Sequence, residues 1–148
     1  MFLLPFALLD SALPQTLSYN AIVLRILLNI LWFIFGGGFL IWLSYVLVGV
    51  LLCISIIGIP FGIQCFKIAR LGAFPFGKDI KRGGAVPIFG TLGNILWFIL
   101  AGVWIFVEHV GLAVVLAITI IGIPFAIQHV KLALLAIWPF GNIAVVPR

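Results

Sequence analysis

The chain has 148 residues, of which 66% are hydrophobic and 7% are charged, and its mean hydropathy is +1.43. Soluble domains contain about 45–50% apolar and about 25% charged residues, so this composition excludes a soluble fold and predicts an all-α membrane protein. The formal net charge is +5, but the few basic residues flank apolar runs, which indicates a role in membrane topology rather than nucleic-acid binding.

The first 24 residues precede the first long uncharged run, and we expect them to form an N-terminal extension (residues 1–24). The apolar stretch at residues 1–9 contains Pro5, ends at Asp10 and is too short to cross a bilayer. No Lys or Arg precedes it, which is not typical of a secretory signal. We expect a flexible or membrane-surface leader that ends near Asn20.

A first membrane unit is predicted over residues 25–77. The segment from Ile26 to Phe66 contains no charged residue over 41 positions, and a helix needs about 20 apolar residues to cross a bilayer. This length predicts two crossings, over residues 26–43 and 46–66, joined by a tight turn.

A Gly-Ile-Pro step, from Gly58 to Pro60, interrupts the second predicted crossing. Because proline has no N–H group, the carbonyl of Ile56 loses its helical partner. Proline is also favoured at the first position of a helix. We therefore predict a short helix over residues 60–71, with Gly72 as its C-terminal cap.

Three interpretations of this helix break are open. A discontinuous membrane helix would present carbonyl and N–H groups to an ion or a polar ligand, as in some transporters. A proline kink whose backbone groups are satisfied by a neighbouring helix, by Ser55 or by water has a purely structural role. The short helix also suits the membrane interface, because Gln64, Lys67 and Arg70 lie roughly on one of its faces.

The same unit occurs a second time, after a polar linker over residues 78–89. Three blocks recur 64 or 65 positions later: residues 29–34 at 94–99, residues 54–61 at 118–125 and residues 74–77 at 138–141. Because separate blocks keep almost the same offset, we predict an internal duplication. The second unit covers residues 90–148.

Glu108 and His109 interrupt the apolar run of the second unit, and they align with residues 43–44 of the first. A glutamate in the middle of a bilayer is costly, whereas in a turn it costs little. We therefore expect the turn of each unit at this place. The crossings of the second unit are then predicted over residues 88–106 and 111–131.

Two crossings per unit bring both termini and the central linker to one side of the membrane. That side then holds all eight basic residues: Arg25, Lys67, Arg70, Lys78, Lys81, Arg82, Lys131 and Arg148. The positive-inside rule places it in the cytoplasm, and the units become parallel repeats related by an axis along the membrane normal. The alternative has one long helix per unit and an inverted second copy, which divides the basic residues between sides and buries Glu108.

Several polar or helix-breaking residues in the apolar segments are candidates for a site. The candidate pathway residues are those at the two breaks: Gly58, Pro60, Gln64, Gly122, Pro124 and Gln128. Asn29 and Asn94 begin the first crossing of each unit. Each amide either caps a helix near the headgroups or binds its counterpart, which would tie the two copies together.

Catalytic and metal sites are not indicated by this sequence. It has three acidic residues and lacks a serine–histidine–acid set, a metal-ligand cluster and a phosphate-binding loop. His109 and His129 are expected at opposite membrane faces, so they would not share a metal ion. We expect neither an enzyme nor a bound cofactor.

The repeated blocks resemble one bacterial family. Asn-Ile-Leu-Trp-Phe-Ile, the Ile-Ile-Gly-Ile-Pro-Phe block and Pro-Phe-Gly, each present twice, are similar to the YccF family of bacterial inner-membrane proteins. The resemblance covers residues 25–148 and implies a multi-pass protein of the bacterial cytoplasmic membrane. It implies no catalytic or binding residues, and it does not extend to residues 1–24.

We expect an oligomeric small pore or transport component, because four short helices enclose little volume and a solute path would form between protomers or between the two copies. The alternative is a membrane module that does not transport, and whose basic face binds anionic lipid headgroups or a soluble partner. That cytoplasmic face consists of Lys67, Arg70, Lys78, Lys81, Arg82 and Lys131. A polar cavity that reaches both Gly-Ile-Pro steps would favour the pore, and a solidly packed bundle would favour the module.

Overall fold

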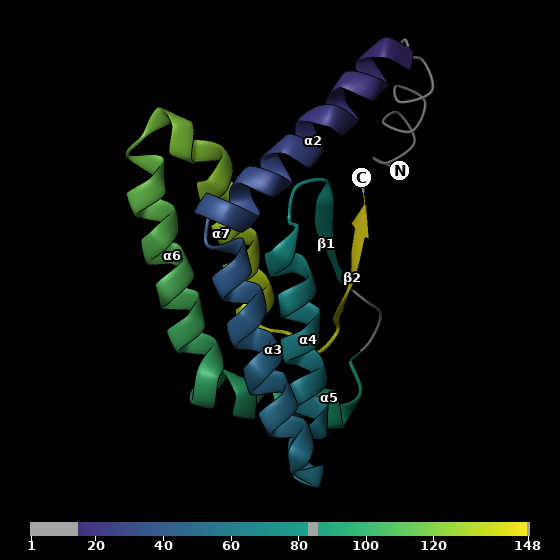
Figure 1. Cartoon of the computed structure of the whole chain (residues 1–148). Coiled ribbons are helices and arrows are strands. Elements are labelled where there is room, and N and C mark those ends of the chain that lie inside the picture. Colours follow the sequence, from purple (N-terminus) through teal and green to yellow (C-terminus); the bar gives the residue numbers. More distant parts are fainter. Residues whose placement is uncertain (1–14, 83–85, 148) are drawn as a thin grey trace.

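The computed structural model describes residues 15–82 and 86–147, and within them the chain is helical apart from one ribbon of two short strands (Figure 1). The elements in chain order are α2 (Gln15–Phe35), α3 (Gly38–Ile54), a 3-10 turn (Ile56–Gly58), α4 (Ile59–Ala73), β1 (Lys78–Arg82), α5 (Ile88–Trp97), a π-helical segment (Phe98–Gly102), α6 (Val103–Ala117), a second 3-10 turn (Ile120–Gly122), α7 (Ile123–Ile137) and β2 (Asn142–Pro147).

Three helical segments are long and apolar enough to cross a membrane: Ile56–Ala73, Ile88–Ala117 and Ile120–Ile137. The bent pair of α2 and α3 adds a fourth if its two halves count as one crossing, because the chain turns by 68° between them. Gly37 at this bend has a φ of 82°, a left-handed conformation that favours glycine. The all-helical membrane architecture is therefore confirmed, with three or four candidate crossings.

The turn of each hairpin lies further along the chain than predicted. Residues 43–44 lie inside α3, and Glu108 and His109 lie inside α6. The predicted turns are therefore wrong, and so are the bounds of the crossings placed on either side of them. The chain turns instead at the Gly-Ile-Pro steps, which connect one helix to the next and lie at the start of a candidate crossing segment.

Side-chain caps explain where these turns form. The Ser55 hydroxyl accepts a hydrogen bond from the Gly58 N–H at 3.1 Å, and the Thr119 hydroxyl accepts one from the Gly122 N–H at the same distance. The next helix then begins with proline in its first turn, where the missing N–H costs nothing. The short helix predicted over residues 60–71 is found as α4.

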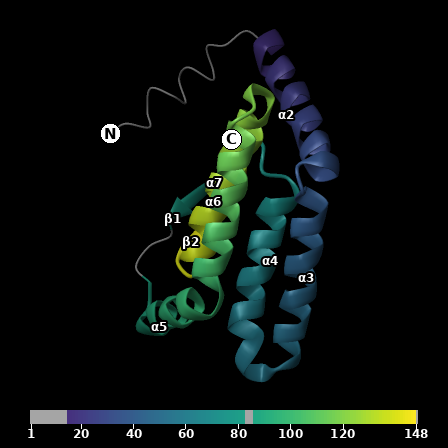
Figure 2. The same cartoon turned by 90° about the vertical axis from the view of Figure 1, so that its left-hand side faces the viewer.

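The two hairpins, α3–α4 and α6–α7, point in opposite directions (Figures 1 and 2). The turn of the first hairpin lies at the end of the molecule where α5 lies, and the turn of the second lies near α2. The prediction of parallel repeats, related by an axis along the membrane normal, is therefore wrong. A two-fold axis that exchanges opposed hairpins must run across them.

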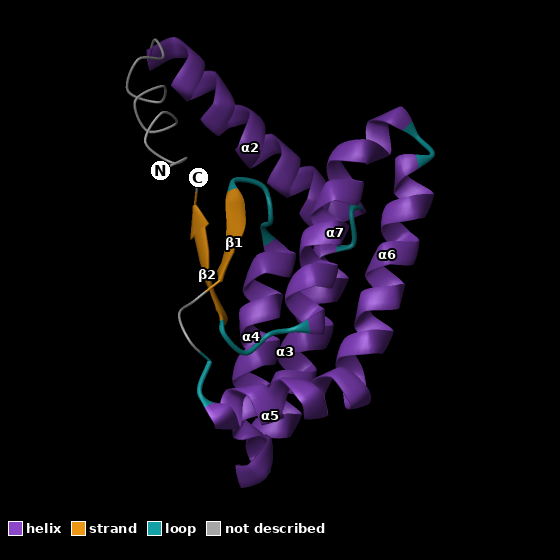
Figure 3. Ribbon diagram, turned by 180° about the vertical axis from the view of Figure 1, so that it is seen from behind, coloured by secondary structure: helices purple, strands orange, loops and turns teal. Residues whose placement is uncertain are grey.

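Strands β1 and β2 form an antiparallel ribbon beside the helices (Figure 3). Ile80 pairs with Val145 and Lys81 with Ala144. Each strand follows a Pro-Phe-Gly sequence whose glycine has a positive φ, of 83° or 88°, which lets the chain turn sharply. The ribbon was not predicted from the sequence, because each short strand obtains its hydrogen bonds from a strand that is distant in the sequence.

The core joins both units. Its fully or largely buried residues are Trp32, Cys65, Ile68, Leu71, Trp97, Leu132, Leu135 and Ala136. Gly72 does not cap α4 as predicted, because the helix continues to Ala73. A Cβ atom at Gly72 would lie 2.5 Å from the Ile41 side chain, so this glycine permits the close approach of α3.

Helix α2 begins at Gln15, so the second half of the predicted N-terminal extension continues the first helix. No proline or glycine interrupts the sequence between Gln15 and Phe35, and the helix extends accordingly. The first half of the extension, residues 1–14, lies outside the described residues. The same holds for residues 83–85, for Arg148 and for the side chains of residues 15–18, 82 and 143–147.

Candidate functional site

Asn29 and Asn94 each bind the backbone of their own unit. Asn29 donates to the Phe76 carbonyl and accepts from the Phe76 N–H, both at 3.0 Å. Asn94 makes the same two bonds with Phe140, both at 2.9 Å. The amides therefore hold each Pro-Phe-Gly segment against the first helix of its unit, and the prediction that they bind each other across the copies is wrong.

Two indole groups cap the ends of the third helix of each unit. The Trp32 Nε1–H donates to the Gly72 carbonyl and the Trp97 Nε1–H to the Ala136 carbonyl, both at 2.7 Å. Both carbonyls lie in the last turn of a helix, α4 or α7, where carbonyl groups have no intrahelical partner. Because both tryptophans are buried, these bonds satisfy oxygens that water does not reach.

Phe61, which follows the proline of the first turn motif, packs against the second unit. Its ring lies parallel to that of Trp97, with 6.2 Å between centroids and 8° between planes. It also meets the ring of Phe140 edge-on, at 5.6 Å and 82°. One aromatic side chain of the first hairpin thus contacts both the core tryptophan and the Pro-Phe-Gly segment of the other unit.

Phe125 makes the reciprocal contacts from the second unit to the first. It stacks on Trp32 at 6.0 Å and 18°, and it meets Phe76 edge-on at 5.8 Å and 89°. Aromatic pairs of this kind add about 0.5–1.5 kcal/mol beyond their burial. These phenylalanines connect the two copies, a role that the sequence analysis assigned to Asn29 and Asn94.

The candidate pathway residues form two groups at opposite ends of the molecule. Gly58 and Gly122 lie in the two hairpin turns, which point away from each other (Figure 1). An added Cβ atom at Gly58 would lie 2.3 Å from the Leu52 carbonyl oxygen, and one at Gly122 would lie 2.1 Å from that of Leu116. The glycines therefore allow tight turns, and the structure does not bring the two breaks together.

The two glutamines of the candidate set bind within their own helices. Gln64 donates to the Pro60 carbonyl at 3.3 Å, and Gln128 donates to the Pro124 carbonyl at 3.1 Å. Each amide oxygen accepts a hydrogen bond from the lysine three residues later. Their hydrogen-bonding groups are thus occupied by the chain itself.

Two lysines of the predicted basic face reach from one unit to the other. Lys67 donates to the Pro139 carbonyl, and Lys131 donates to the Lys78 carbonyl at 3.1 Å. Pro139 precedes β2, and Lys78 is the first residue of β1. The basic residues therefore gather around the ribbon and the C-terminal halves of α4 and α7.

Lys78 lies at the start of β1, outside the helices. Its ammonium group donates to the Arg70 carbonyl at 3.2 Å and lies 5.8 Å from the centre of the Phe74 ring. Burial, and then the nearby positive charge of Arg70, lower the pKa of Lys78 below its ordinary value. The side chain of Lys81 is exposed.

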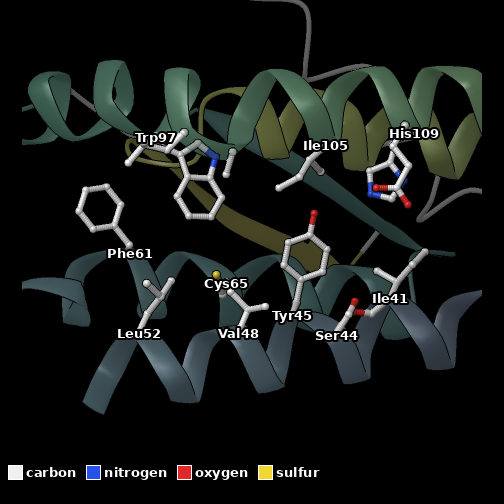
Figure 4. Close-up of a pocket in the computed structure, with 13 residues that line it drawn as sticks. Ile41, Ser44, Tyr45, Val48, Leu52, Phe61, Cys65, Trp97, Ile105 and His109 are labelled. Carbon is white, nitrogen blue, oxygen red and sulfur yellow. The ribbon is translucent and has the colours of Figure 1, made fainter. Parts of the chain in front are cut away.

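A groove of about 420 Å³ lies between α3 of the first unit and α5–α6 of the second (Figure 4). Its walls are mostly apolar, and Phe61 and Trp97 lie at one end. Ser44 and His109 lie at the other end (Figure 4), and Glu108 also lines the groove. The groove was not predicted from the sequence, because Glu108 was expected in a turn.

His109 and His129 face each other between α6 and α7. Their Nδ1 atoms are 3.2 Å apart, and both side chains are buried. The prediction that they lie at opposite membrane faces is therefore wrong, because α6 and α7 run side by side over this length. Among the described residues, no group of three His, Cys, Asp or Glu side chains has the geometry to hold a metal ion.

The protein-family model of the YccF inner membrane component domain matches residues 27–78 and 92–142. The chain is also similar to the inner membrane protein YccF of Escherichia coli K12 and to the protein of that name from Shigella flexneri. Each is 32% identical over 128 residues, which cover 80% of this chain and 86% of the relative. No solved structure matches the chain significantly. The resemblance seen in the sequence is thus confirmed, and the chain belongs to the YccF family of bacterial inner-membrane proteins.

Proposed function

We propose that this protein is a lipid-binding module of the inner membrane, whose basic side holds anionic lipid headgroups. The observation that carries the proposal is the gathering of basic residues from both units around the ribbon: Lys67, Arg70, Lys78, Lys81 and Lys131. The two predicted break sites do not converge, and the largely apolar groove extends to Phe61 beside the first turn but not to the second turn. Both features favour the module over a pore within one chain.

The energetics of charge in a bilayer support this assignment. An ammonium or guanidinium group is costly in the hydrocarbon core, so the ribbon side suits the headgroup region. Each Lys or Arg near an anionic surface contributes about 1 kcal/mol of attraction. A second cavity, of about 630 Å³, lies beside the ribbon. Its lining includes N–H donors on Lys131, Trp138 and Asn142 and also the carboxylate of Asp79.

The ribbon also supports a cytoplasmic position for the central linker and the C-terminal segment. Because β1 pairs with β2, we place both segments on one side of the membrane, an arrangement in which the two opposed hairpins do not both cross the bilayer. The positive-inside rule assigns that side to the cytoplasm. A membrane-impermeant thiol reagent applied to Lys81→Cys in intact cells and in inverted vesicles tests this, and labelling of intact cells would contradict the proposal.

Lipid selectivity tests the function itself. We expect phosphatidylglycerol to raise the thermal stability of the purified protein in detergent more than phosphatidylcholine does. The double variant Lys78→Gln/Lys81→Gln should lose most of this difference, because two of the headgroup cations are removed. Lys78→Arg/Lys81→Arg keeps both charges and should retain it. An equal response to both lipids in the wild type would refute the proposal.

The opposed hairpins favour a second candidate function. Transporters are often built from two repeats of inverted topology, with the substrate site between them, and opposed hairpins that cross the bilayer would have this relation. The two Gly-Ile-Pro steps lie at opposite ends of the folded molecule. A path lined by both steps would therefore need a second copy of the chain to bring them together. Transport therefore requires the predicted homo-oligomer.

A flux assay in liposomes separates the two functions. A transport component should carry an ion or small solute, and Pro60→Ala/Pro124→Ala should change its rate, because the proline substitutions alter both hairpin turns. If the protein is a lipid-binding module, neither the wild type nor Pro60→Ala/Pro124→Ala should show flux. The oligomeric state in the same detergent, measured by light scattering, shows whether a second copy is present.

A further inference from the structure

Glu108 stands out as a carboxylate on a membrane helix without a partner. It lies in the middle of α6 and lines the groove between the two units. Within the described part of the chain, neither a hydrogen bond nor an ion pair involves its carboxylate. The Glu108 side chain is exposed, and α6 belongs to a segment that is long and apolar enough to cross a membrane. An ionised acid that faces hydrocarbon is costly unless a cation accompanies it, and the groove has no Lys or Arg among its lining residues.

Besides Glu108, the groove offers aromatic surface and further polar groups, among them Ser44 and His109. Tyr45, Phe61 and Trp97 all line the cavity (Figure 4). Phe61 and Trp97 stack on each other at the end of the groove opposite His109, so of the three rings Tyr45 is the one placed to attract a cation at Glu108. The Tyr45 hydroxyl points across the groove toward α6 (Figure 4) and has no hydrogen bond with the other described residues.

We propose that this groove binds a lipophilic organic cation, such as a quaternary ammonium or phosphonium ion with aryl or alkyl substituents. Its positive centre lies at Glu108, and its substituents occupy the apolar length of the groove toward Phe61 and Trp97. The volume of about 420 Å³ falls in the range of pockets for small organic ligands. The site is separate from the basic residues at the ribbon, so neither proposal depends on the other.

Charge complementarity selects this occupant over others. An anionic lipid would place its phosphate beside the Glu108 carboxylate, which repels it. A neutral acyl chain would fill the apolar part and leave the carboxylate without a partner. A lipophilic cation satisfies both ends of the groove, because it carries apolar surface together with a positive charge that is weakly hydrated.

Isothermal titration calorimetry of the purified full chain in a nonionic detergent tests the proposal. The probe is tetraphenylphosphonium, and its matched control is tetraphenylborate, an anion of nearly the same size and shape. We expect the cation to bind and the anion not to bind. Glu108→Gln should weaken the binding of the cation at least tenfold, because it removes the charge and keeps the shape of the side chain.

Three further variants keep the test decisive if Glu108→Gln folds poorly. Glu108→Asp keeps the charge and should retain binding, and Ala101→Leu fills the groove without changing a charge and should abolish it. Asp79→Asn removes an acid that does not line the groove and should bind like the wild type. Equal binding of tetraphenylborate, or unchanged binding by both Glu108→Gln and Ala101→Leu, would overturn the proposal.

Discussion

The buried indole groups of Trp32 and Trp97 satisfy carbonyl oxygens that lie 40 and 39 residues further along the chain. The sequence shows that both tryptophans belong to a repeated block, but it does not show which oxygens they bind. The need for those bonds arises where two helices end inside the core. Such a need depends on packing, so residue patterns in one segment cannot reveal it.

Replacing one of these indoles should destabilise the protein. In Trp97→Phe, the Ala136 carbonyl loses its donor in a buried place, which costs about 1–3 kcal/mol for an unsatisfied group. The free energy of unfolding in detergent micelles should fall by this amount. Trp104→Phe is the control, because Trp104 is 71% exposed and its replacement should change the free energy little. A larger loss for Trp104→Phe would contradict this assignment.

The hydrogen-bond partners of Asn29 and Asn94 were likewise not predictable from the sequence. Their position at the start of each unit and their polar character were visible in the sequence. Their partners were not, because an amide facing the other copy and an amide facing its own backbone leave the same pattern. Only the fold of the Pro-Phe-Gly segments, which return to the first helix, decides between the two.

For the hairpin turns, the sequence predicted the helix that follows each turn but not the position of the turn itself. The proline at the start of α4 and the boundaries of that helix were predicted, since capping signals are local. The position of the turn was wrong, because Glu108 was assigned to solvent on the ground of its charge. In the structure it faces a groove formed by two units, and no local signal marks such a groove.

The glycine of the second turn should tolerate no side chain. Gly122→Ala places a Cβ atom 2.1 Å from the Leu116 carbonyl oxygen, and backbone cannot move aside cheaply. We expect a loss of about 1–3 kcal/mol in the free energy of unfolding. Gly111→Ala is the matched control, because nothing lies within 4 Å of its Cβ position, and a helical alanine should stabilise by about 0.5–1 kcal/mol.

A disulfide should form across the ribbon between cysteines at two positions that the observed register places opposite each other. Ile80 and Val145 are partners, and directly opposed Cβ atoms lie about 4.5–5.5 Å apart, close enough for a bond in Ile80→Cys/Val145→Cys after mild oxidation. In a chain that otherwise has Cys53 and Cys65 replaced by alanine, gel mobility reports the crosslink. Lys78→Cys/Ile143→Cys is out of register and should not crosslink, and efficient crosslinking there would refute the pairing.

At the scale of the whole molecule, the duplicated sequence folds into two hairpins of opposite direction, interlocked through Phe61 and Phe125. The duplication was predicted from the repeated blocks in the sequence, and the two matched segments of the family model correspond to it. The relative direction was inferred from the distribution of basic residues. That inference was wrong, because it placed the turns at residues 43–44 and 108–109, whereas the chain turns at the Gly-Ile-Pro steps and the two units share one core.

Opposed hairpins make a direct prediction for the distance between their turns. Spin labels at Ile57→Cys and Ile121→Cys, two highly exposed positions, should be further apart than the length of one 15-residue helix, about 22 Å. Double electron–electron resonance measures this distance in micelles. A separation shorter than one helix would indicate parallel hairpins, with both turns at one end of the molecule.

The sequence by itself determined that this protein belongs in a membrane, that it is helical, that it contains a duplication and to which family it belongs. These properties follow from composition and from local or repeated patterns, which do not depend on how the chain closes. The tertiary structure alone decided where the hairpins turn, how the units are oriented, and which residues form the ribbon, the core and the groove. Each of these depends on contacts between units, and a contact between distant residues leaves no trace in the pattern of either segment.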